Sequence, residues 1–123
     1  MDSIILISAT EDTPKVIGSA DGKLSIIGKS ITEDSLVFYK PILEWITQIK
    51  AENIEISIQL EYLNTSSSKQ IFNLLKLAKE NQWKKTILIK WFYEMNDEDE
   101  RELGKEYESL LEIPFEFYNF LNL

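Results

Sequence analysis

The chain has 123 residues, enough for one domain, and 44% of them are hydrophobic, which is too many for a disordered protein. It contains no Cys and no His, which excludes disulfides, thiolate chemistry, Cys/His zinc sites and every His-dependent catalytic triad. The net charge of −8 argues against nucleic acid, whose binders need a basic surface, and against an acidic membrane surface, so the default partner is another protein.

Apolar patterning predicts nine elements along the chain. Asp21-Gly22, between two short apolar runs, is a hairpin signal. The clearest strand is 54–62, where hydrophobic and polar residues alternate strictly, so that one face is buried and the other is wet. Helices are predicted where apolar residues recur every three or four positions. In chain order we expect strands at 3–9, 15–18 and 23–27, a helix at 35–50, a strand at 54–62, a helix at 67–80, a strand at 86–93, a helix at 97–111 and a strand at 114–118.

The order β-β-β-α-β-α-β-α-β predicts one α/β (α+β) domain over residues 1–123, built on a mixed sheet. Strands separated by helices imply parallel pairing through right-handed crossovers, and the alternation in 54–62 places the helices mainly on one face. Pro41 lies inside the first helical pattern, where it either kinks the helix or occupies the first turn of its main part. Asp97 and Glu100 have capping-box spacing at the start of the third helix.

A polar run, Asn64-Thr65-Ser66-Ser67-Ser68, stands between the strand 54–62 and the helix 67–80. One interpretation is structural, because Asn, Ser and Thr side chains accept hydrogen bonds from the first turn of a helix, and Ser67 and Gln70 have capping-box spacing. The other is a phosphoacceptor, because a hydroxyl at a strand-to-helix junction is accessible to a kinase. The residues by themselves favour the cap and do not choose among the four hydroxyls.

Energetics predicts what a phosphate in this run would do. At a helix N-terminus it meets the positive end of the dipole, which stabilises it by about 0.3–1 kcal/mol. If a partner covers this end without a matching cation, desolvation of the phosphate costs about 3–4 kcal/mol and weakens binding roughly 10²–10³-fold. The interface term exceeds the helix term, so the expected outcome is a change in binding with little change in fold.

The segment from Leu60 to Lys69 resembles the signature of the SiaC family of bacterial regulatory phosphoproteins, and the likeness extends along almost the whole chain. It includes the segment 9–14, the polar residues before the first helix and the aromatic run near residue 92. The matching stretches are Ala9-Thr10-Glu11-Asp12-Thr13-Pro14, Gly28-Lys29-Ser30, Glu33-Asp34, Phe38-Tyr39-Lys40-Pro41-Ile42, Trp45, Trp91-Phe92-Tyr93-Glu94, the acidic residues 97–100, Gly104 and Pro114-Phe115.

The resemblance implies a fold and logic like those of anti-sigma-factor antagonist (STAS) domains. There a serine/threonine kinase phosphorylates a residue at a helix start and a PP2C-type phosphatase restores it. The unphosphorylated SiaC-like protein engages and activates a diguanylate cyclase, which connects it to cyclic-di-GMP signalling and biofilm formation. Position by position, the modified threonine corresponds to Thr65. The implied docking surface for kinase, phosphatase and effector is Asn64, Ser66, Ser67, Ser68 and Lys69.

Other readings stay open beside this one. The runner-up is a constitutive protein-binding adaptor whose Ser/Thr run is only a cap, and a third class is a small-ligand sensor. The carboxylates between 94 and 102 lack the spacing of a calcium loop, and nothing places two acids in a pocket, so we expect neither metal, cofactor nor enzyme activity. Phe92 and the loop 10–14 are further candidates for an interface.

No apolar run approaches the roughly 20 residues that a membrane span requires. The first three residues also lack the basic segment of a signal peptide. We therefore expect a cytoplasmic protein without direct membrane insertion.

Overall fold

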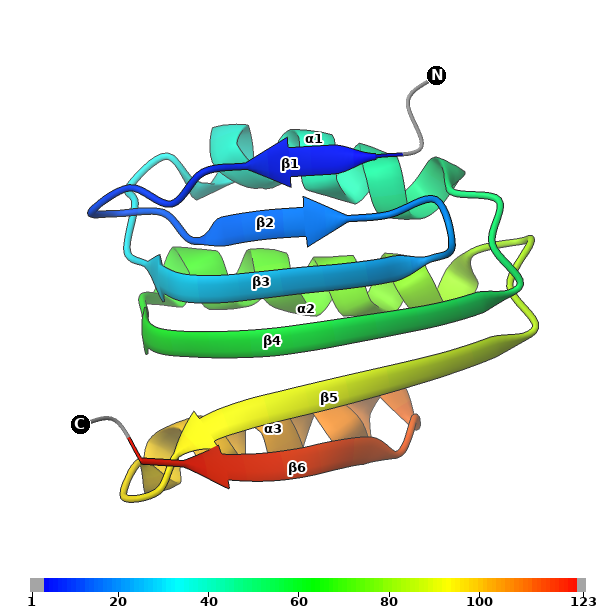
Figure 1. Ribbon diagram of the computed structural model, residues 1–123. Coiled ribbons are helices and arrows are strands. Elements are labelled where there is room, and N and C mark those ends of the chain that lie inside the picture. The colour runs from blue at the N-terminus through cyan, green and yellow to red at the C-terminus, as the bar shows by residue number, and fades with distance from the viewer. Residues whose placement is uncertain (1–3, 122–123) are drawn as a thin grey trace.

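The computed structural model describes residues 4–121, and within them the elements follow the predicted order (Figure 1). One six-stranded sheet has the order β1-β2-β3-β4-β5-β6, so every strand lies beside its neighbour in sequence. The first three strands pair antiparallel and the last four parallel. The elements are β1 Ile5–Ile7, β2 Lys15–Gly18, β3 Lys23–Ser30, α1 Ser35–Gln48, β4 Asn53–Leu63, α2 Thr65–Glu80, β5 Thr86–Glu94, α3 Glu98–Leu111 and β6 Phe115–Phe120.

All three helices cover the same face of the sheet (Figure 1). This is the outcome of right-handed crossovers that always advance to the next strand in one direction. The predicted mixed α/β fold with its helices on one face is therefore confirmed. None of the helices in the described part of the chain is both long enough and apolar enough to traverse a lipid bilayer.

Strand β4 carries the centre of the core. Ile54, Ile56 and Ile58 are at most 1% exposed and face the helices, while Glu55 and Gln59 lie on the open face. The predicted alternation fails only at its end, where Tyr62 is 61% exposed. The pairing of β3 with β4 shifts register just before this point, at the bulge between residues 28 and 29 of β3.

The predicted hairpin forms between β2 and β3, and Gly22 is indispensable to it. Its φ is +94°, and a Cβ there would lie 2.4 Å from the carbonyl oxygen of Asn53. Only glycine combines this backbone conformation with so close an approach. The turn therefore also seats the hairpin against the start of β4.

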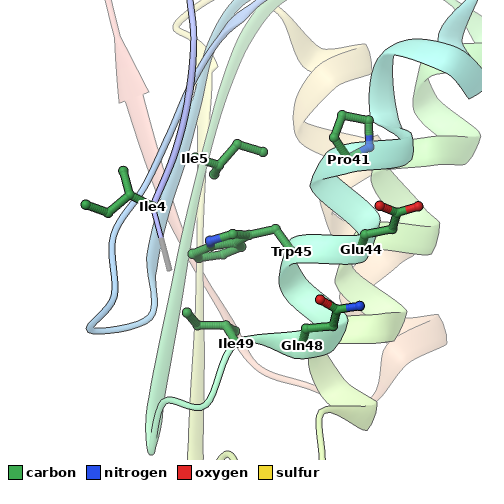
Figure 2. A pocket seen from close by; sticks show the side chains of 7 residues that line it. All are labelled: Ile4, Ile5, Pro41, Glu44, Trp45, Gln48 and Ile49. Carbon is green, nitrogen blue, oxygen red and sulfur yellow. The ribbon is translucent and has the colours of Figure 1, made fainter. Parts of the chain in front are cut away.

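Helix α1 starts at Ser35, so Pro41 lies well inside it and the alternative that placed Pro41 in the first turn is wrong. Figure 2 shows the Trp45 ring reaching from α1 toward Ile5 of β1, with Ile49 beneath it. These side chains line a hollow of about 200 Å³, and a Cβ on Gly18 would lie 2.6 Å from Ile5 and 2.9 Å from the indole ring of Trp45. The contacts between the side chains around this hollow attach the short edge strand β1 to α1.

Helix α3 is fastened to the sheet by Trp91 of β5. The Trp91 side chain is fully buried, and its Nε1–H donates to the carbonyl oxygen of Glu100 over 2.9 Å. As predicted, Asp97 caps the helix, because its Oδ1 accepts from the Glu100 N–H at 3.0 Å. The reciprocal half of the capping box is absent: the Asp97 N–H donates to the Glu94 carbonyl, and Oε1 of Glu100 is buried without a hydrogen-bond partner.

Candidate functional site

Helix α2 begins at Thr65, two residues earlier than predicted, and Asn64 is its N-cap. The Asn64 Oδ1 accepts the N–H of Ser67 over 2.9 Å. Ser67 therefore lies in the first turn, and the predicted capping box of Ser67 with Gln70 is wrong. The N-cap bond is thus made by the side-chain amide of Asn64 and not by a hydroxyl residue of the run.

Asn64 also fastens this helix start to the loop that follows β3. Its side-chain Nδ2 donates to the Thr32 carbonyl at 3.0 Å, and its backbone N–H donates to the Ser30 carbonyl at 3.0 Å. The next residue of that loop, Ile31, donates its N–H to the Asp12 carbonyl. Three connections meet here, at the carboxyl end of the parallel strands β3 and β4, where α/β folds commonly hold their functional residues.

The residues of the polar run differ in accessibility. Thr65, Ser66 and Lys69 are exposed, and Ser68 is partly buried with its hydroxyl donating to the Thr65 carbonyl over 2.8 Å. Ser67 is 0% exposed, and its hydroxyl has no hydrogen-bond partner. The expectation that Ser67 lines the docking surface is therefore corrected: the N-cap places it in the first turn with its side chain turned into the protein.

Thr65 lines a hollow of about 530 Å³ between the starts of α1 and α2. The opposite wall carries Glu33 from the loop and Asp34, the N-cap residue of α1. It also carries Leu36 and Val37, which are 71% and 74% exposed. An exposed apolar pair beside an exposed hydroxyl is typical of a surface that a partner covers.

The sequence reasoning missed Leu36 and Val37. The helical stripe of α1 is carried by Tyr39, Ile42 and Ile46, which are fully buried. Val37 stands outside that stripe, which is the signal that could have identified it. Leu36 could not be identified in this way, because it stands three residues before Tyr39, at stripe spacing.

Charge at the hollow is mixed. The first turn of α2 contains no acidic residue, so no carboxylate there opposes an anion near the positive end of the helix dipole. Lys69 follows Thr65 by four residues, a spacing at which an acidic group and a lysine attract each other on a helix. Glu33 and Asp34 on the facing wall supply opposing negative charge. A phosphate on Thr65 would be held by α2 and repelled across the hollow.

The other candidates have structural roles in the described chain. Phe92 lies on the open face of the sheet and stacks on Tyr118 with ring centroids 5.0 Å apart. In the loop 10–14 the Thr10 hydroxyl oxygen accepts the N–H groups of Asp12 and Thr13, which makes a compact turn. Between residues 4 and 121, no three acidic side chains converge in a way that could hold a metal ion.

Burial changes the acidity of one carboxyl in the acidic stretch. Desolvation, reinforced by the charge of Asp97, raises the pKa of Glu100 to about 7. Glu100 is 8% exposed, lies in the first turn of α3, and does not line the hollow that contains Thr65. We therefore interpret it as a feature of the α3 packing rather than of the site.

The fold and the site define a protein-interaction domain with an exposed hydroxyl at a capped helix start. Comparison with known proteins agrees. The family described as SiaC family regulatory phosphoprotein matches residues 7–120, and the chain belongs to this family. The chain is accordingly a regulatory protein and not itself an enzyme. It is also 31% identical, over 89% of its length and 90% of the relative, to an uncharacterized protein of Pseudomonas aeruginosa strain UCBPP-PA14.

Solved structures of SiaC from Pseudomonas aeruginosa have the same fold. One is 27% identical, with a TM-score of 0.82 over 98% of this chain and 100% of that chain. Another is apo-SiaC, 28% identical with a TM-score of 0.83 over 96% and 99% of the two chains. A third contains SiaC as the activator in a complex with the diguanylate cyclase SiaD, at 29% identity and a TM-score of 0.84 over 94% and 99%.

Proposed function

We propose that the chain is a partner-switch protein whose unphosphorylated form binds and activates a diguanylate cyclase in the cytoplasm, and that phosphorylation of Thr65 ends this binding. A serine/threonine kinase adds the phosphate and a PP2C-type phosphatase removes it. The output is a change in cyclic-di-GMP and, through it, in biofilm formation. The observation that carries the proposal is the exposed Thr65 hydroxyl at a capped helix start, facing the exposed apolar pair Leu36 and Val37.

Accessibility narrows the choice among the four hydroxyls. Ser67 is buried, and Ser68 is partly buried and engaged with the backbone of its own turn. Ser66 is exposed, but its hydroxyl donates to Oδ1 of Asn64 at 3.3 Å. The family resemblance selects Thr65, and the burial pattern supports that selection. Lys69, Ser66 and Asn64 then form the near edge of the docking surface.

The switch depends on whether the phosphate at the N-terminal end of α2 is solvated or covered by a partner. In the free chain the phosphate is solvated and lies at the N-terminus of α2, so the helix tolerates it. A partner seated on Leu36 and Val37 must cover the same hollow, whose far wall contributes Glu33 and Asp34. Lys69 offsets only part of the charge of a dianion, and burying the remainder without a matching cation costs about 3–4 kcal/mol, which is a loss of roughly 10²–10³-fold in affinity.

The alternative of a constitutive adaptor needs the Ser/Thr run to serve only as a cap. That argument weakens because Asn64 supplies the cap through its own side chain. A small-ligand sensor has no specific observation in its favour. Both alternatives predict that no condition of growth leads to a phosphate on this chain.

The deciding experiment measures cyclase binding by calorimetry with four samples: unmodified chain, chain phosphorylated at Thr65, Thr65→Ala and Ser66→Ala. We expect the phosphorylated chain to lose at least 100-fold in affinity and both alanine variants to stay within about threefold of the wild type, because each removes one small exposed hydroxyl at the edge of the docking surface. Ser66→Ala is the matched control, because it removes a neighbouring exposed hydroxyl. It should still be phosphorylated, whereas Thr65→Ala should not. Equal cyclase affinities for the phosphorylated and unmodified chains would refute the switch.

A further inference from the structure

A second groove runs along α2, between α2 and α3. It consists of two hollows of about 380 and 430 Å³ that share Phe72 and Leu110. Its upper end shares Lys69 and Gln70 with the hollow that contains Thr65. The Thr65 hollow and this groove therefore flank the start of α2, and Lys69 and Gln70 lie between them. Figure 1 shows the arrangement that creates it: α2 lies behind β3 and β4, and α3 behind β5 and β6.

The floor of this groove is apolar and aromatic. Phe72 and Tyr107 meet edge to face with ring centroids 5.1 Å apart, and the Tyr107 hydroxyl donates to the Ser68 carbonyl at 2.7 Å. Leu110 stands in the groove with 62% of its surface exposed. A large side chain that is both exposed and adjacent to an aromatic floor is a ready anchor point for a partner.

The wall formed by α2 is basic, although the chain as a whole has a net charge of −8. Lys69, Lys76 and Lys79 line the two hollows, and Glu80 at the far end is the acidic residue among their lining side chains. Lys79 is engaged, because its Nζ donates to the Leu111 carbonyl over 2.6 Å. Lys69 and Lys76 take part in none of the ion pairs found among residues 4–121.

We infer that this groove binds an amphipathic helix of a partner protein, with acidic residues on the side that faces α2. The groove lies between two helices and has an apolar floor, which is the geometry of helix-in-groove recognition. The positive charges of Lys69 and Lys76 favour acidic residues on the facing side of the bound helix. The α3 residues that line the two hollows are Tyr107, Leu110 and Leu111, none of them basic, so acidic residues of the occupant are directed toward α2.

The inference deepens the proposed function and rests on it for its regulatory meaning. Lys69 belongs both to the groove and to the hollow of Thr65. A phosphate on Thr65 would attract Lys69 along the helix and repel the acidic end of the docked helix. Phosphorylation of Thr65 would thereby weaken the binding of the partner helix, although the main contact of that helix is with Leu110, elsewhere in the groove.

The first test is independent of the cyclase. The probe is a synthetic helical peptide of about 20 residues, long enough to be helical, with leucines on one face and glutamates flanking them. The control peptide carries lysines in place of the glutamates. In titrations followed by NMR, the acidic peptide should shift the amides of Phe72, Lys76 and Leu110, and the basic peptide should not. Shifts confined to other surfaces, equal response to both peptides, or no shift at millimolar acidic peptide would overturn the inference.

Variants make the test quantitative. Lys76→Glu should lower the affinity for the acidic peptide about three- to tenfold, since it replaces an attraction by a repulsion at an exposed position. Leu110→Ala should weaken it at least fivefold, and because Leu110 is largely exposed the variant should fold normally. Lys40→Glu is the control, an equal charge reversal at an exposed position of α1 outside the groove. Wild-type affinity of both groove variants would contradict the inference.

The same variants, measured against the cyclase, separate the two proposals. If phosphorylation of Thr65 abolishes cyclase binding while Lys76→Glu and Leu110→Ala bind it normally, the switch stands and the groove proposal fails. If the groove variants weaken cyclase binding and phosphorylation does not, the groove stands and the switch fails. Loss of binding in all three supports both.

Discussion

Asn64 is the residue on which the geometry of the site depends, and its replacement by alanine tests this directly. The substitution removes the cap on the Ser67 N–H, which contributes about 1 kcal/mol at a typical helix start. It also removes the bond to the Thr32 carbonyl, which contributes about another 1 kcal/mol. We expect the free energy of unfolding to fall by about 2 kcal/mol, which lowers the Tm by about 6–8 °C for a domain of this size.

Asn64→Asp is the informative companion. A carboxylate keeps the cap and favours the helix dipole, but it cannot donate to the Thr32 carbonyl and places negative charge against that oxygen. The free energy of unfolding of Asn64→Asp should therefore fall by about half as much as that of Asn64→Ala. In hydrogen exchange, the amides of residues 31–34 should lose protection in both variants, and that of Ser67 only in Asn64→Ala.

Urea unfolding followed by circular dichroism measures the stabilities. A loss below about 0.5 kcal/mol for Asn64→Ala, which is within the effect of an ordinary surface substitution, would refute this account of the site. So would equal losses for the two variants, because the cap and the tie to the loop would then not be separable. Unchanged protection in residues 31–34 would show that Asn64 does not hold the loop.

Three further predictions concern buried positions in α2 and α3. Because the pKa of Glu100 is raised to about 7 from 4.5, the native state binds this proton more tightly than the unfolded state, so ionisation between these values lowers stability as pH rises. Glu100→Gln should therefore be more stable than the wild type at pH 8, by about 3 kcal/mol at most, and the advantage should vanish near pH 4; a constant difference across a pH series of urea unfolding curves would contradict this. Gly104→Ala would place a Cβ 2.6 Å from Cδ1 of the buried Trp91, so the Tm should fall despite the better helix propensity, with a net cost of about 1–2 kcal/mol; an unchanged Tm would show that Trp91 can shift freely. Ser67→Ala removes a buried hydroxyl that has no partner, so it should stabilise by about 0.5 kcal/mol and leave partner binding unchanged; weakened binding measured by calorimetry would return Ser67 to the interface.

Local patterning determined most of the fold. The alternation in β4, the helical spacing in the three helices and the Asp-Gly turn each depend on neighbours a few residues apart, so they can be read without knowing what lies across the core. The crossover rule then converts the order of elements into one sheet with one covered face. The candidate hydroxyl run could be found in the same way, because it stands between the alternating pattern of β4 and the helical pattern of α2.

Tertiary structure decided which residues of that run act as cap, core and surface. Asn64 was identifiable as a possible cap, but its second bond joins it to a carbonyl that lies 32 residues earlier in the chain. That contact fixes the start of α2, turns Ser67 inward and leaves Thr65 outward. The exposed pair at 36 and 37 and the basic groove beside α2 depend on how the helices lie against one another. Such contacts join residues distant in sequence, and no short-range period records them.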